Sequence, residues 1–171
     1  MRPKMTLELP AILALDPGGT TGWCWWDPAE DLLFRGQIGP HGHHGELLKF
    51  LTNKIETRVT QKCHIVCERF EFRPTDSERN KIEYISAEYV GVVKLLAEWY
   101  KKSNVKLVMQ SAAQVKGKDK ENRDTVFFSD ARLKKLALWI PGMRHAMDAT
   151  RHYAYHRTFT LHDQTYIYAS K

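Results

Sequence analysis

Cysteine is scarce in this 171-residue sequence, and long apolar runs are missing. The three cysteines form no Cys-x-x-Cys pair, and an odd number in a chain of this length does not indicate a disulfide framework. No run approaches the length of a transmembrane helix, and the opening MRPKMTLELP contains no apolar signal-peptide core. We therefore expect a cytoplasmic protein of a reducing compartment, with no membrane partner.

Internal repeats and linker-like segments are also missing, so we expect a single domain over residues 1–171. The hydrophobic fraction of 43 % is that of a globular chain and argues against disorder. Lys and Arg number 26 against 20 Asp and Glu, which gives a formal net charge of +6. This modest basic excess is compatible with a polyanionic partner but does not require one.

The hydrophobic pattern predicts an α/β protein with a mixed sheet. Short apolar runs predict strands at 11–16, 23–26, 32–38, 63–70 and 105–109. Apolar residues spaced three and four apart predict helices at 45–59, 85–100, 133–140 and 143–158. Three early strands in succession are typical of a meander, whereas each later strand follows a helix and must join the sheet in parallel. The last residues fit no element.

Two carboxylates stand at the ends of predicted strands. Asp16 ends the run ILALD before Pro-Gly-Gly-Thr-Thr-Gly, and Glu68 lies near the end of CHIVCERF. His145 and Asp148, three residues apart, share one face of the last predicted helix. If the strands are neighbours and this helix packs across their ends, the four side chains converge into a set suited to hard divalent cations. Such a set favours phosphodiester hydrolysis with two metal ions.

Each of these residues also has an ordinary explanation. An Asp before Pro-Gly is often a turn former, Glu68 can pair with its neighbouring arginine, and the helical pair can lie on a solvated face. The joint placement favours the metal site, in which Asp16 bridges both ions and Glu68 and Asp148 bind one each. His145 is then a ligand or a proton relay.

Two further histidines continue the helical stripe that carries His145 and Asp148. His152 lies four residues after Asp148, and His156 lies four residues later again. His152 can support the site by orienting Asp148, or both histidines can simply lie on a polar helix face. The polar face is the more common arrangement, and we expect it for one or both histidines.

The segments ILALDPGGTTGW, IVCERF and RHAMDATRHYAYH resemble the three acidic motifs of the RuvC-like Holliday junction resolvases, in the ribonuclease H-like superfamily. QSAAQVKG, residues 110–117, resembles the stretch after the family's last strand. The resemblance spans residues 11–157. It implies a ribonuclease H-like fold, a mixed five-stranded sheet flanked by helices. The lone compact domain without accessory modules suggests a nuclease of the bacteriophage type, which would work in the host cytoplasm.

The resemblance also implies an activity. It implies a Mg²⁺-dependent endonuclease, with Mn²⁺ as a possible substitute, that binds branched DNA as a homodimer and cuts two strands symmetrically. The positions that match the family's metal-binding and catalytic set are Asp16, Glu68, His145 and Asp148. Some family members carry Asp where this chain has His145, so that difference lies within the family's pattern.

A second difference concerns the DNA-binding surface that the resemblance implies. Family members often carry a Phe three residues after the glutamate, which helps to open the junction, but this chain has Glu71 there. Phe70 and Phe72 flank that position, and either can stack on a base or pack in the core. Candidate phosphate contacts, which give salt-dependent affinity, are Arg69, Arg73, Lys116 and Lys118.

Three alternatives stay open. The same nuclease site can act on a flap, a fork or an RNA precursor; symmetric cutting of a four-way junction needs a two-fold axis, so a dimer would discriminate. A non-catalytic DNA-binding protein can share the fold. Asp-Pro-Gly-Gly-Thr also resembles the phosphate loop of actin-like sugar kinases, but those enzymes need two such domains and this chain has one such loop.

Overall fold

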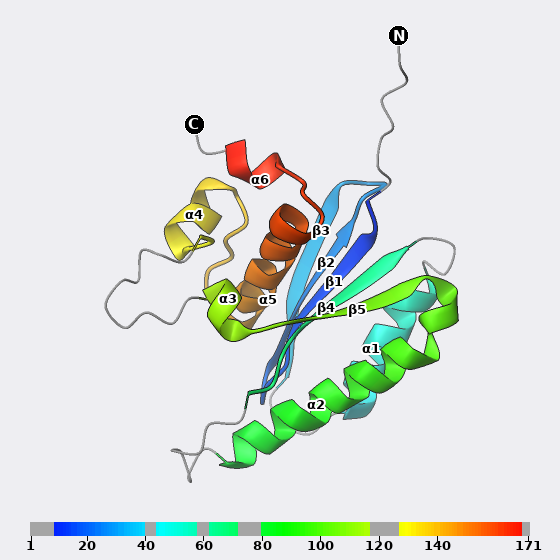
Figure 1. The fold of residues 1–171 in the computed structure, drawn as a ribbon. Helices are drawn as coiled ribbons and strands as arrows, with labels where there is room; N and C mark the ends of the chain where they lie inside the picture. Colours follow the sequence, from blue (N-terminus) through cyan, green and yellow to red (C-terminus); the bar gives the residue numbers. More distant parts are fainter. Residues whose placement is uncertain (1–8, 40–43, 58–61, 72–79, 117–126, 169–171) are drawn as a thin grey trace.

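The computed structural model describes residues 9–39, 44–57, 62–71, 80–116 and 127–168. Within them, five strands form one sheet in the order β3-β2-β1-β4-β5 (Figure 1). The strands are β1 (Ala11–Asp16), β2 (Thr21–Asp27), β3 (Leu32–Ile38), β4 (Cys63–Glu68) and β5 (Val105–Gln110). β1, β2 and β3 form an antiparallel meander, and β4 and β5 join parallel to β1. The predicted mixed five-stranded sheet is confirmed.

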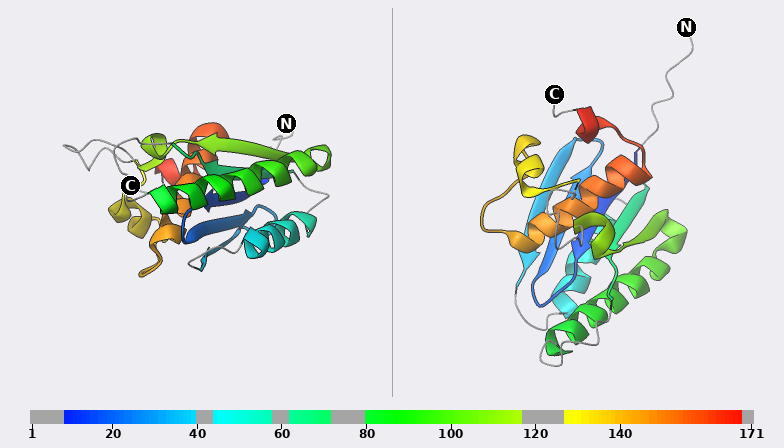
Figure 2. Two further views of the ribbon diagram at one scale, coloured as in Figure 1. Left: turned by 90° about the horizontal axis from the view of Figure 1, so that it is seen from below. Right: turned by 60° about the vertical axis from the view of Figure 1, so that its left-hand side comes forward.

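Helices cover both faces of this sheet (Figures 1 and 2). One face carries α1 (His44–Glu56) and α2 (Asn80–Trp99), and the other is crossed by α5 (Arg144–Tyr155). Three short helices lie on the α5 side: α3 (Ala112–Lys116), α4 (Asp130–Lys135) and α6 (Thr165–Tyr168). A 3-10 turn spans Lys101–Ser103, and a π-helical turn, His156–Thr160, follows α5. Among the described residues, no helix is both long enough and apolar enough to cross a membrane.

The alternation of side chains along β1 divides the apolar residues into two cores. Ala11, Leu13 and Leu15 pack on the side of α1 and α2, whereas Ile12 and Ala14 pack on the side of α5. Asp16 continues the second series. The same alternation places Glu68 after Val66 on β4, and Gln110 after Val108 on β5. Three adjacent strands therefore end in a polar residue on the face that α5 covers.

The first turn of α5 is fixed by the antiparallel strands. At Gly22 of β2 the helix comes so close that an added Cβ would lie 1.9 Å from the carbonyl oxygen of His145. From β3, the side-chain oxygen Oε1 of Gln37 accepts hydrogen bonds from the backbone N–H groups of His145 (3.0 Å) and Ala146 (3.5 Å). Helix N-termini leave such N–H groups without an intrahelical partner, so Gln37 caps α5 from another element.

Several element boundaries differ from the prediction: β4 ends at Glu68 and not at residue 70, α1 ends at Glu56 and not at residue 59, and α2 begins at Asn80 and not at residue 85. The predicted helix at 133–140 is wrong at its end, because α4 stops at Lys135 and Ala137 adopts a left-handed φ of 54°. The guanidinium of Arg35 on β3 then donates to the carbonyl oxygen of Leu138 at 2.7 Å, which keeps this segment against the sheet. The predicted helix at 143–158 begins at Arg144 and changes to π-helical geometry from residue 156.

The C-terminal segment that fitted no predicted element contains α6, which is held in place by the buried guanidinium of Arg157. The guanidinium of Arg157 lies 4.0 Å from the ring centroid of Trp26 and donates to the hydroxyl oxygens of Tyr153 (2.8 Å) and Tyr166 (3.2 Å). It also pairs with Asp163. These contacts hold α6 against the end of α5.

Candidate active site

The centre of the site is a cluster of two carboxylates and an imidazole, in which only Glu68 is partly exposed. Asp16 is 7 % exposed, and His152 on α5 is fully buried. The His152 Nε2 atom lies 2.8 Å from Oε2 of Glu68, and one ligand atom from each of the three side chains lies within 4.8 Å of the others. Burying carboxylates costs free energy unless a cation or hydrogen-bond donor compensates. The cluster therefore has the character of a cation site.

The dimensions of the cluster fit one divalent ion. Ligands on opposite sides of Mg²⁺, each about 2.0–2.1 Å from the ion, are about 4.2 Å apart. The 4.8 Å separation is about 0.6 Å larger, a difference that small side-chain rotations close. Two carboxylate oxygens with one imidazole nitrogen also suit Mn²⁺, for which imidazole is a good ligand.

Gln110 determines how His152 is presented to this cluster. The Nδ1 atom of His152 lies 2.8 Å from Oε1 of Gln110, while the amide nitrogen of Gln110 is buried without a hydrogen-bond partner in the described residues. When Nδ1–H donates to Gln110, the lone pair of Nε2 is free to bind a cation, and an ion bound by both Nε2 and the Glu68 carboxylate would satisfy both groups. Without a cation, Nε2 must carry a proton to donate to Glu68. Gln110 thus favours the imidazole tautomer that binds metal.

His145 contacts Asp16 from the first turn of α5. Its Nδ1 atom lies 3.3 Å from Oδ2 of Asp16, and its side chain is 42 % exposed. The hydrogen bond to Asp16 raises the pKa of His145; burial opposes this shift, and the charges of Asp16 and Asp148 support it. The protonated imidazole is therefore favoured at a position that is still open to solvent, where it can deliver or receive a proton.

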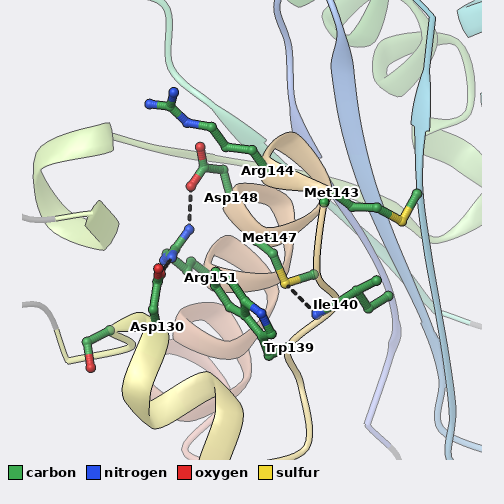
Figure 3. A pocket seen from close by; sticks show the side chains of 10 residues that line it. Asp130, Trp139, Ile140, Met143, Arg144, Met147, Asp148 and Arg151 are labelled. Carbon is green, nitrogen blue, oxygen red and sulfur yellow. Dashed lines mark hydrogen bonds and ion pairs between the residues drawn. The ribbon is translucent and has the colours of Figure 1, made fainter.

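Asp148 lies one turn after His145, at the border between this cluster and a neighbouring pocket. Its carboxylate accepts a hydrogen bond from Nη1 of Arg151 at 2.5 Å (Figure 3). Arg151 also pairs with Asp130 and donates to the carbonyl oxygen of Phe128. The guanidinium of Arg151 therefore pairs with both Asp148 and Asp130 of α4.

The structure thus brings Asp16, Glu68 and His145 together, places Asp148 at their edge, and adds His152. The alternative in which His152 lies on a polar helix face is wrong, because its two ring nitrogens are buried between side chains of β4 and β5. Gln110 was not predicted as a site residue. The available signal was its position, since it ends a buried strand on the same face as Asp16 and Glu68.

Some candidates for the nucleic-acid contact lie near the cluster. Arg69 is exposed directly after Glu68, and Phe70 is half-buried against the core on the α1 and α2 side. Both line a cavity of about 220 Å³, together with Lys94 of α2. Lys116 ends α3, and the structure describes its backbone. Three candidates lie outside the described residues: Phe72, Arg73 and Lys118.

Comparison with known proteins gives matches in structure but not in sequence. No protein-family model matches the chain, and no curated protein is significantly similar to it. A structure of Thermus thermophilus RuvC in complex with a Holliday junction substrate matches with a TM-score of 0.62 and 14 % identity, covering 91 % of this chain and 98 % of that one. A second Thermus thermophilus RuvC structure matches with a TM-score of 0.52 and 14 % identity, covering 88 % and 96 %. The predicted RuvC-like fold is therefore confirmed.

Proposed function

We propose that this chain is a metal-dependent endonuclease that cuts branched DNA, with the four-way Holliday junction as its principal substrate. The observation that carries the proposal is the convergence of Asp16, Glu68 and His152 at the ends of two adjacent parallel strands. The likeness to the RuvC structure with a bound Holliday junction supports this choice of substrate. Residues 1–171 would act as one nuclease domain.

In this proposal Asp16, Glu68 and His152 hold one divalent ion, and Asp148 with His145 completes the site from the first turn of α5. Mg²⁺, or Mn²⁺ in its place, would supply an activated water and stabilise the leaving oxygen during phosphodiester hydrolysis. Asp16 lies between Glu68 and His145, so it is the residue that would bridge two ions. Asp148 would turn from Arg151 toward the ion, which leaves Arg151 with Asp130.

His145 has a separate role in the proposal. Its imidazole contacts Asp16 and is partly exposed, so it can exchange protons with solvent and with a substrate oxygen. Because the contact with Asp16 raises its pKa, the imidazolium is the form available to protonate a leaving oxygen. Replacement of His145 by Asn should then slow cleavage more at low pH, where the wild-type imidazole is protonated, than at high pH, where wild type has also lost this acid.

The exposed surface of α2 supports a homodimer. Gly91, Leu95 and Trp99 follow one another at spacings of four, which places them on one face of the helix. Leu95 is 68 % exposed and Trp99 76 % exposed, and an added Cβ at Gly91 would meet nothing within 4 Å. An apolar stripe of this kind marks an interaction site. A second copy packed along α2 would supply the two-fold axis needed to cut two strands symmetrically.

A single gel tests the nuclease. Purified wild type and Asp16→Asn are incubated with a four-way junction, a flap, a linear duplex and a structured RNA, each with Mg²⁺, Mn²⁺ or EDTA. We expect paired symmetric nicks in the junction that disappear with EDTA and with Asp16→Asn. Asp16→Asn should still bind the junction, because its side chain is nearly the same size.

The other outcomes are equally informative. Preferential cutting of the flap or the RNA keeps the metal site and rejects the junction as substrate. Binding without any cleavage favours a DNA-binding protein that shares the fold. Cleavage by Asp16→Asn at the wild-type rate rejects the assigned roles. For the dimer, sedimentation equilibrium of wild type and Leu95→Glu should show a dimer and a monomer respectively, and a monomeric wild type contradicts that part of the proposal.

A further inference from the structure

A pocket of about 800 Å³ lies beside the candidate active site, between the first half of α5 and the segment 129–142 (Figure 3). Its volume is within the range of about 300–1,000 Å³ that is usual for ligand pockets. Trp139, Ile140, Met143 and Met147 form an apolar wall. The Sδ atom of Met147 accepts a hydrogen bond from the backbone N–H of Ile140 at 3.2 Å, so this wall is held directly against α5.

The rest of the pocket is charged and continues into the candidate active site. Asp148 lines the pocket and also belongs to the proposed metal site, so a group bound here lies next to the metal-binding cluster. Arg144 is exposed at the pocket and immediately precedes His145 in the chain. Arg151 joins Asp148 to Asp130, which places hydrogen-bond donors and acceptors together on one wall.

This combination fits a nucleotide better than a purely apolar or purely charged ligand. A nucleobase needs an aromatic or apolar surface for its ring and polar groups for its edge, while its phosphate needs a cation. Trp139 offers the ring surface, Asp130 and Arg151 offer polar groups, and Arg144 offers the cation. The ammonium of Lys134, 5.0 Å from the Trp139 ring centroid, adds positive charge beside this ring.

We propose that this pocket receives one unpaired nucleobase of the strand that is cut, from a nucleotide next to the cleaved phosphate, and that Trp139 stacks on it. The inference rests on the proposed nuclease function, because it takes the position of the cleaved phosphate from the metal site. It adds a residue that selects where a branched strand is cut: the pocket admits a base only where pairing is already lost or easily lost.

The test is a double-mutant cycle in which the Trp139 side chain and one DNA base are removed separately and together. Values of kcat/KM are measured for wild type and Trp139→Leu on the intact junction and on junctions with a single abasic residue at each position around the cut. For wild type, we expect an abasic residue at one position adjacent to the cleaved phosphate to lower kcat/KM about tenfold, which is the loss typical of one stacked base. On the intact junction, Trp139→Leu should have a kcat/KM about tenfold below that of wild type. On that abasic junction, its kcat/KM should fall no further. Trp139→Phe, which keeps an aromatic ring, should retain most of the rate.

Additive losses, or a Trp139→Leu variant that cuts every junction like wild type, overturn the proposal and leave the pocket to another kind of ligand. Thermal unfolding checks that both variants fold. If Trp139→Leu does not fold, the abasic scan of wild type decides, because equal rates at every position contradict a bound base. If wild type cuts no branched DNA, the proposed function fails separately, and dissociation constants for the same intact and abasic junctions then test the pocket.

Discussion

Gly22→Ala is the substitution that tests most directly how the fold positions the site. The new Cβ would lie 1.9 Å from the carbonyl oxygen of His145 and 2.2 Å from its carbonyl carbon, about 1.5 Å short of the 3.4 Å at which ordinary contact begins. Both partners are backbone atoms, so no side chain can rotate away. The start of α5 must move from β2, and His145 must move with it.

The cost can be estimated. Overpacking of this kind destabilises a protein by about 1–3 kcal/mol, which for a chain of this size lowers Tm by roughly 3–10 °C. The first turn of α5 would lose the hydrogen bonds to Gln37, and the contact of His145 with Asp16 would lengthen from 3.3 Å. Displacement of a catalytic group by about 1 Å costs about 100-fold in rate. We expect a folded protein with a slightly lower Tm and about 100-fold slower cleavage.

Thermal unfolding and single-turnover cleavage of the junction measure the two effects. Gly45→Ala is the matched control, because an added Cβ there meets nothing within 4 Å and alanine suits the α1 helix. Its Tm should be unchanged or slightly raised, and its cleavage rate should equal that of wild type. A Gly22→Ala protein with wild-type Tm and rate would refute the reasoning, since it would show that α5 does not depend on its contact with β2.

Three further predictions concern buried polar groups. His152→Ala should weaken Mn²⁺ binding by about 10- to 100-fold in a calorimetric titration, whereas His162→Asn, at an exposed histidine, should bind like wild type. His64 and His156 form a ring pair with Nδ1 and Nε2 2.9 Å apart, and burial lowers the pKa of each from 6.5 to about 4. The unfolded chain therefore takes up protons between pH 6.5 and pH 4 that the folded chain does not. The free energy of unfolding should fall with acid by up to about 1.4 kcal/mol per pH unit for each histidine, less for the partly exposed His64. Urea unfolding should show a shallower pH dependence for His156→Gln, and an identical slope would contradict this assignment. Arg157→Met should destabilise the protein by about 3–5 kcal/mol, because it leaves Asp163 without its buried cation; Arg157→Lys should recover little, since one ammonium cannot reproduce the bonds of a guanidinium.

The sheet could be predicted because its signals are local. Each strand is a short apolar run that ends at a polar or turn residue, and the positions of Asp16 and Glu68 at strand ends follow from the run lengths alone. The order of strands and helices then leaves few possible topologies. The same reasoning placed His145 on the helix that crosses these strands, although no local signal showed its contact with Asp16.

The features that could not be predicted depend on partners far away in the chain. His152 is bound to Gln110, 42 residues before it, and to Glu68, 84 residues before it, so a lone sequence does not distinguish it from a histidine on a polar face. The end of α4 is fixed by Arg35, which binds the Leu138 carbonyl from 103 residues away. Apolar residues at helical spacing continue in the sequence beyond Lys135. The helix nevertheless ends at Lys135, where the left-handed Ala137 and the contact of Arg35 with Leu138 follow.

The position of α5 late in the chain has a consequence for biosynthesis. The five strands are complete once Gln110 has been added, but α5 begins 34 residues later, at Arg144. At about 5–20 residues per second, this interval lasts about 2–7 s. During it α5 cannot yet cover the sheet face formed by Ile12, Ala14 and Val66, so we expect the nascent chain to expose apolar surface that chaperones can bind. His145 and His152 arrive only with α5, and we expect the growing chain to be unable to cut nucleic acid until the helix that completes the core also completes the site.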